Sequence, residues 1–68
     1  MSDYFENQVK RSFFDAVRAN DFESVENYIS RFELDVDITD ELGNTALNLA
    51  SQLSLYDMIE KLILTGAD

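Results

Sequence analysis

Cysteine, histidine and proline are absent from this 68-residue chain, and only two glycines are present. Without cysteine or histidine the chain cannot form a disulfide, a zinc finger or most other transition-metal sites, so only carboxylates remain as metal ligands. Two isolated glycines also exclude a glycine-rich phosphate-binding loop. A chain this short makes one small domain with a marginal core. Hydrophobic packing must hold it together, and the apolar fraction of 46% is typical of a globular protein.

Basic residues are also scarce: five lysines and arginines stand against fourteen aspartates and glutamates, which gives a net charge of −9. This balance argues against contact with nucleic-acid phosphates or anionic lipid, and it favours solubility or a partner with a basic surface. No segment approaches the ~18 apolar residues of a membrane span, and the N-terminus lacks the features of a signal peptide. We therefore expect a cytoplasmic protein that binds neither nucleic acid nor membranes.

Apolar residues recur at three- and four-residue steps in four segments, and this spacing predicts an all-α fold with four helices. The first helix is expected to begin near Asp3 and to reach about residue 19. The dipeptide Asn20-Asp21 predicts a break, because both residues tolerate the left-handed conformation and cap helices well. The second helix is expected over residues 22–32. The stripes of these two helices are formed by Phe5, Val9, Phe13, Ala16, Val17, Phe22, Val25, Ile29 and Phe32.

Residues 33–44 have a different pattern, which predicts one extended finger loop between two helix pairs. Apolar and polar residues alternate in its first half, and a turn that ends at Gly43 follows. Thr45 is placed to cap a third helix. A fourth helix is expected to follow a weak break near Ser54 and to end at Gly66.

The second half of the chain repeats the first at a shift of 33 residues, a period typical of one class of helical repeat. Val25 then falls on Met58, and apolar residues coincide at nearly every position of the stripes. The same shift aligns the inter-helix turns, at Asp21 and Ser54. Aromatic residues at helical spacing are expected in the core, with the exception of Tyr28, which falls on a lysine and is expected at the surface.

Two motifs in the second half are similar to those of a known repeat family. Residues 40–50 have the sequence DELGNTALNLA, and residues 62–68 have the sequence LILTGAD. They resemble the D-x-x-G-x-T-P-L-H-x-A pattern of ankyrin repeats and the L-L-L…G-A-D ending of that family. The first half matches less well, with Glu33 where the family has Gly. The resemblance implies ankyrin-type helix–turn–helix repeats, an N-terminal cap repeat at 1–34 and a second repeat at 35–68.

The two halves differ at the ends of their second helices. Ser30 and Arg31 correspond to Ile63 and Leu64, and polar residues there suit a terminal repeat whose outer face meets water. The last helix instead has more apolar residues than one stripe needs. We expect the chain to be the N-terminal part of a longer array. Further repeats or a second copy would pack on the face formed by Met58, Ile59, Ile63 and Leu64.

The resemblance implies a scaffold or adaptor that binds another protein. In ankyrin arrays the fingers and the inner helices line a concave face that contacts partners. Leu42 and Leu53 are apolar at places that are normally polar, so they are either contact points or scattered surface residues. By this resemblance, the positions of this chain that correspond to partner-binding positions of the family are Thr39, Glu41, Leu42, Asn44, Gln52 and Leu53.

Other classes of function have less support in the sequence. No motif supplies a nucleophile with a base, so no catalytic or cofactor-binding residues are expected. Five carboxylates between Glu33 and Glu41 could attract calcium, but the register of a calcium-binding EF-hand loop fails, so no metal site is expected. An alternative function is a small acidic inhibitor that mimics nucleic acid and blocks a basic enzyme.

Overall fold

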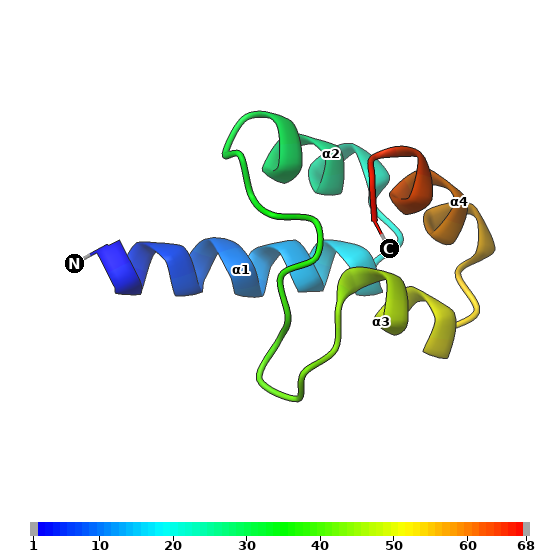
Figure 1. Ribbon diagram of the computed structural model, residues 1–68, viewed down its shortest axis with the longest axis horizontal. Helices are drawn as coiled ribbons and strands as arrows, with labels where there is room; N and C mark the ends of the chain where they lie inside the picture. Colours follow the sequence, from blue (N-terminus) through cyan, green and yellow to red (C-terminus); the bar gives the residue numbers. More distant parts are fainter. Residues whose placement is uncertain (1, 68) are drawn as a thin grey trace.

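Four helices and no strands make up the part of the chain that the computed structural model describes, residues 2–67, with side chains from residue 5 onward. They are α1 (Ser2–Arg18), α2 (Phe22–Ser30), α3 (Ala46–Gln52) and α4 (Tyr56–Leu64) (Figure 1). The predicted all-α fold with four helices is confirmed. Asp68 and the side chain of Asp3 lie outside the described residues. Within those residues, none of the helices has the length and apolar character needed to cross a membrane.

The helices form two antiparallel pairs that meet through α1 and α3. Helix α1 packs against both α2 and α3, and α3 packs against α4 (Figure 1). On the α2–α4 side, the Lys61 ammonium lies 4.7 Å from the centre of the Phe22 ring, a cation–π contact between the two outer helices. The core is entirely apolar and takes residues from every helix. Its members are Phe13, Phe14, Ala16, Val17, Val25, Ala46, Leu49, Ala50, Met58 and Leu62.

Three of the helices end in the same backbone hydrogen-bond pattern. After α1, the Asn20 N–H bonds to the Val17 carbonyl at 3.0 Å and the Asp21 N–H to the Ala16 carbonyl at 2.9 Å. Equivalent bonds follow α3 and α4. The pattern needs a residue in the left-handed region, and Asn20, Ser54 and Gly66 have φ of 58°, 57° and 107°. The predicted breaks at these places are therefore confirmed.

The repeat has a slightly different register from the one predicted. The left-handed residues of the two inter-helix turns are Asn20 and Ser54, which are 34 positions apart, so the pairing of Asp21 with Ser54 is wrong by one residue. The left-handed residues after α2 and α4 are Glu33 and Gly66, which are 33 positions apart as predicted. The segment between Asn20 and Glu33 in the first helix pair is therefore one residue longer than the segment between Ser54 and Gly66 in the second.

The finger loop between α2 and α3 is irregular and contains no strand. A turn interrupts the predicted extended segment, because the Ile38 N–H bonds to the Asp35 carbonyl at 3.0 Å. The alternating residues Leu34, Val36 and Ile38 are half-buried and pack against the core. The loop crosses α1 on its way to α3 (Figure 1).

Aromatic residues at the free end of α1 depart from their predicted burial. Phe5 is 60% exposed and Phe32 is 52% exposed, although both were expected on buried stripes. For Phe5 the reason is length: α1 has 17 residues, about 25 Å of helix, whereas α2 has 9 and covers only part of it. For Phe32 the reason is that α2 ends at Ser30, before the predicted residue 32, so Phe32 is not on its buried stripe. Tyr28, expected at the surface, is half-buried, with its ring centre 6.4 Å from that of Phe13 and 5.5 Å from that of Phe32.

The apolar face of α4 on which further repeats or a second copy were expected to pack is smaller than predicted. Met58 is fully buried in the core, so its assignment to that face is wrong. Ile59 is half-buried, and Ile63 and Leu64 are 54% and 78% exposed. Five apolar residues on one short helix cannot share a single face, and Met58 falls on the side that packs against the core. At the end of α2 the polar residues Ser30 and Arg31 are exposed, as expected for a terminal repeat.

Leu62→Ala is expected to destabilise the protein strongly, because Leu62 is fully buried and the substitution leaves a cavity. The expected loss in the free energy of unfolding is about 2–5 kcal/mol. Leu64→Ala is the matched control, since Leu64 lies on the same helix and is 78% exposed; its effect should stay within about 0.5 kcal/mol. Urea denaturation followed by circular dichroism measures both. Similar losses for the two variants would contradict the described packing of α4.

Two Ser→Gly substitutions are expected to have opposite effects. Ser54 has φ of 57°, a conformation that glycine adopts without strain, so Ser54→Gly should raise the free energy of unfolding by about 0.5 kcal/mol. Ser51 lies inside α3, where Ser51→Gly should lower the same quantity by about 0.5 kcal/mol. Thermal unfolding of the two variants beside the parent protein is the measurement. A loss of stability in the Ser54 variant would argue against the left-handed turn.

Candidate partner-binding groove

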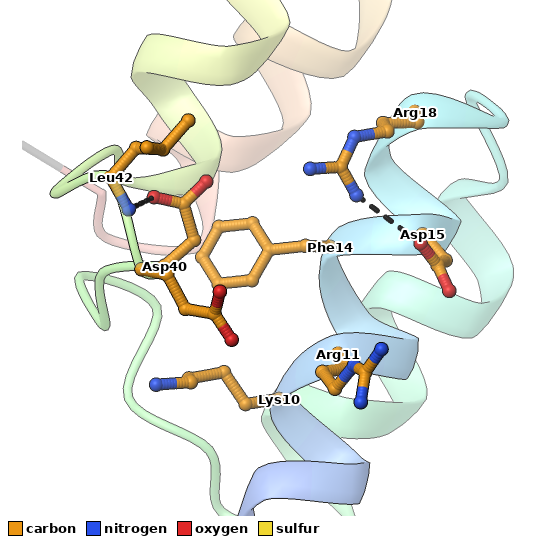
Figure 2. Close-up of a pocket in the computed structure, with 8 residues that line it drawn as sticks. Lys10, Arg11, Phe14, Asp15, Arg18, Asp40 and Leu42 are labelled. Carbon is orange, nitrogen blue, oxygen red and sulfur yellow. Dashed lines mark hydrogen bonds and ion pairs between the residues drawn. The ribbon is translucent and has the colours of Figure 1, made fainter.

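A groove with a volume of about 290 Å³ lies between α1 and the tip of the finger loop (Figure 2). One wall is α1 and the other is the turn at residues 40–42. We call it the α1–finger groove. Its lining residues are Lys10, Arg11, Phe14, Asp15, Arg18, Asp40, Glu41 and Leu42.

Helical spacing builds the α1 wall. Lys10, Phe14 and Arg18 are four residues apart and therefore lie in one row along the helix. Figure 2 shows the Phe14 ring pointing from α1 toward the loop, with Lys10 and Arg18 on either side of it. The Phe14 side chain is only 2% exposed. It forms an apolar floor between two basic side chains.

Hydrogen bonds hold the finger tip in one conformation. Asp40 Oδ1 accepts from the backbone N–H of Leu42 at 2.9 Å (Figure 2). The same oxygen accepts from the backbone N–H of Asn44, also at 2.9 Å. The Gly43 N–H bonds to the Asp40 carbonyl at 3.0 Å, and Gly43 has φ of 82°, which favours glycine there. The turn predicted at residues 40–43 is thus present. It leaves Leu42 86% exposed at the mouth of the groove.

The pKa of the Asp40 carboxyl is lowered from its ordinary value. The hydrogen bond from the Asn44 N–H has the largest effect, because it stabilises the charged form. Partial desolvation opposes it, while the Leu42 N–H and the positive charge of Arg18 act in the same direction as Asn44. Asp40 is therefore a structural carboxylate whose negative charge helps to hold the tip of the loop.

The groove gathers Lys10, Arg11 and Arg18, three of the five basic residues of the chain. Arg18 Nη1 forms a salt bridge with Asp15 Oδ1 at 3.2 Å, and both side chains are largely exposed, so this pair adds little stability. Lys10 and Arg11 make no hydrogen bond or ion pair with any described residue. Their charges are available to a ligand.

Sequence reasoning missed this basic wall, because the net charge of −9 hides a local cluster of positive charge. The spacing of Lys10 and Arg18, two full steps of four along a predicted helix, was the signal that could have revealed it.

Four of the six predicted site residues have defined places in or beside the groove. Glu41 and Leu42 line it. Gln52 Nε2 donates a hydrogen bond to Asn44 Oδ1 at 3.2 Å, which links the finger to the end of α3. The other two are exposed but do not line the groove: Thr39 lies on the loop before the tip, and Leu53, 46% exposed, follows α3.

The α1–finger groove combines charged and apolar groups. In the described part of the chain no polar or charged residue is buried. Within the same residues no three or more acidic side chains come together in a way that could hold a metal ion. The groove presents an apolar floor, two unpaired cations, an exposed leucine and the Glu41 carboxylate. These groups suit ion pairs, hydrogen bonds and apolar contact with a peptide segment.

The chain is similar to a segment of E3 ubiquitin-protein ligase Ufd4 of Drosophila melanogaster. The two sequences are 34% identical over 62 residues. The match covers 91% of this chain but only 2% of the ligase, so the chain is similar to a small part of a far larger protein. No protein-family model matches the chain, and no solved structure does.

The stability that Asp40 contributes is expected to depend on pH. Because its pKa is lower in the folded than in the unfolded state, this contribution is complete above the unfolded value of about 3.9 and is lost as the pH falls through the folded value. The variant Asp40→Asn has no carboxylate at this position, so it lacks this contribution to stability at every pH. The difference in unfolding free energy between the parent protein and this variant should therefore be largest near neutral pH and shrink as the pH falls below the unfolded pKa.

Urea denaturation at several pH values measures this difference. Glu41→Gln is the control, because Glu41 is the exposed neighbour and accepts no hydrogen bond from a described residue. A difference between the parent protein and Asp40→Asn that did not change with pH would show that the Asp40 charge has no part in holding the turn.

Proposed function

We propose that this chain is a protein-binding module that receives a segment of another protein in the α1–finger groove. The observation that carries the proposal is Leu42. Its apolar side chain is 86% exposed on a turn that hydrogen bonds already hold, beside a floor formed by Phe14. A partner that buries Leu42 gains apolar contact at little further cost in ordering the loop.

We further propose that the two helix pairs are ankyrin-type repeats, a cap repeat at 1–34 and a second repeat at 35–68. Three features support this type: the order helix, turn, helix, finger; the recurrence of left-handed residues; and the Thr45 cap, whose hydroxyl oxygen accepts from the Asn48 N–H at 3.1 Å. In such an array a further repeat or a second copy would cover the apolar face of α4. That face comprises Ile59, Ile63 and Leu64.

The charges suggest which partner segment fits. The net charge of −9 attracts a basic protein at long range and speeds the encounter. At short range, Lys10 and Arg11 favour an acidic group in the groove, while Glu41 on the opposite wall favours a basic one. We propose a partner with a basic surface whose bound segment carries an apolar residue for Leu42 and charges of both signs.

The proposed role is non-catalytic and cytoplasmic. The chain has neither histidine nor cysteine, and the groove offers groups that bind rather than groups that transfer a proton or an acyl chain. The similarity to a 62-residue segment of a ubiquitin ligase is compatible with a binding module inside a larger assembly. The alternative of a nucleic-acid mimic is not favoured by the three basic residues that gather in one groove.

Leu42→Asp is expected to reduce partner capture at least about tenfold, because a charge replaces a proposed central contact. The measurement is affinity capture by the tagged 68-residue chain from a cell extract, with quantitative mass spectrometry of the proteins retained. Leu53→Asp tests the second proposed contact in the same way.

Tyr56→Asp is the matched control, since it also places an acid at an exposed apolar residue, 75% exposed, but on α4. Circular dichroism verifies that each variant remains helical. If Leu42→Asp retained the same proteins in the same amounts as the parent chain, the groove would not be the binding site.

A further inference from the structure

A second pocket lies on the other side of the finger loop, between the start of α1 and residues 32–38. Its volume is about 230 Å³. In Figure 1 the N-terminal half of α1 projects beyond the other helices, and the loop passes beside it. We call it the N-terminal pocket. Its lining residues are Phe5, Glu6, Val9, Phe32, Glu33, Leu34, Asp35 and Ile38.

The walls of this pocket are apolar and partly anchored in the core. Leu34 and Ile38 are half-buried against the core cluster. The Phe32 ring lies 5.5 Å from that of Tyr28, which in turn stands edge-on to the buried Phe13. Phe32 is thus held in place although it is 52% exposed, and Phe5, 60% exposed, adds a second aromatic from α1. Two exposed phenylalanines from separate elements beside one pocket form an apolar surface that a ligand can cover.

Among the described residues that line the pocket, the charged ones are all acidic. Glu6, Glu33 and Asp35 are exposed, and of the described residues that line the pocket none is basic. Asp35 Oδ1 accepts from the Asp37 N–H at 2.9 Å. Glu6 and Glu33 make no hydrogen bond or ion pair with a described residue. The pocket therefore has the opposite charge character to the wall of α1 that lines the α1–finger groove.

The size and charge of the pocket limit what can occupy it. Small-molecule sites are usually about 300–1,000 Å³, so 230 Å³ suits a single large side chain of a peptide. Cations beside that side chain would pair with the carboxylates and lie near the aromatic rings. A second copy of the chain carries the same net charge of −9, and mutual repulsion disfavours it as the occupant.

We propose that the N-terminal pocket is a second binding site, which takes a peptide segment with one large apolar side chain flanked by lysine or arginine. It does not depend on the α1–finger groove, because the two sites share no lining residue. The apolar side chain enters between Phe5 and Phe32, and the basic residues face Glu6, Glu33 and Asp35.

The test is a titration of the ¹⁵N-labelled 68-residue chain with the capped peptide Lys-Lys-Leu-Phe-Lys-Lys, followed by NMR. We expect saturable shifts of amides at residues 5–9 and 32–38, and binding that weakens as salt is added. The same peptide with glutamate in place of each lysine should bind at least about tenfold more weakly. Equal binding of the two peptides, an absence of saturable shifts, or shifts confined to residues 10–18 and 40–42 would overturn the proposal.

Matched variants separate charge from apolar contact. The triple variant Glu6→Gln, Glu33→Gln and Asp35→Asn should bind the basic peptide at least about tenfold more weakly. The triple variant Glu23→Gln, Glu26→Gln and Glu60→Gln removes the same charge from other exposed sites and should bind like the parent chain. Equal weakening by both triple variants would show that only net charge matters and would overturn the proposed site.

For the apolar contact, Phe5→Ser should weaken binding, and its exposed position keeps the core intact. Leu42→Ser, at the other groove, should leave binding of this peptide unchanged, so failure of this proposal is distinguishable from failure of the proposed function. Shifts at residues 5–9 and 32–38 that appear with rising protein concentration and no peptide would instead assign the pocket to self-association and overturn the proposal.

Discussion

The rest of the structure depends on the adjacent pair Phe13 and Phe14. Successive residues on an α-helix point about 100° apart, yet both side chains are buried, at 0% and 2% exposure. Phe13 meets Tyr28 of α2, whereas Phe14 faces the finger loop. Helix α1 is therefore covered on two sides, and it is the element that joins the first helix pair to the second.

Because α1 packs between α2 and α3, the loop that connects those two helices has to cross it. That crossing creates a pocket on each side. On one side the second half of α1 supplies Lys10, Arg11 and Arg18, and on the other the loop and the first turns of α1 supply Glu6, Glu33 and Asp35. A chain with a net charge of −9 thus presents two sites of different charge. Local charge, more than net charge, therefore sets the electrostatic character of each pocket.

Much of the fold could be predicted because its signals are local. Thr45 caps the helix that begins at the next residue through a bond to a backbone N–H three residues away, and Gly66 adopts the left-handed conformation that ends α4. Such features need only neighbours in sequence. The one-residue error in the repeat register arose at Asn20 and Asp21, because both residue types tolerate the left-handed conformation and only the packing selects Asn20.

By itself, the sequence determined four helices, their order, most of their ends, the acidic character and the absence of histidine and cysteine. Only the tertiary structure decided that Met58 is buried, that Phe5 and Phe32 are exposed, and that Lys10 and Arg18 face the turn at Asp40. The physical reason is how far apart along the chain the interacting residues are. Helix formation and capping depend on hydrogen bonds between residues three or four apart, whereas burial and the charge of a groove depend on which distant segments pack together.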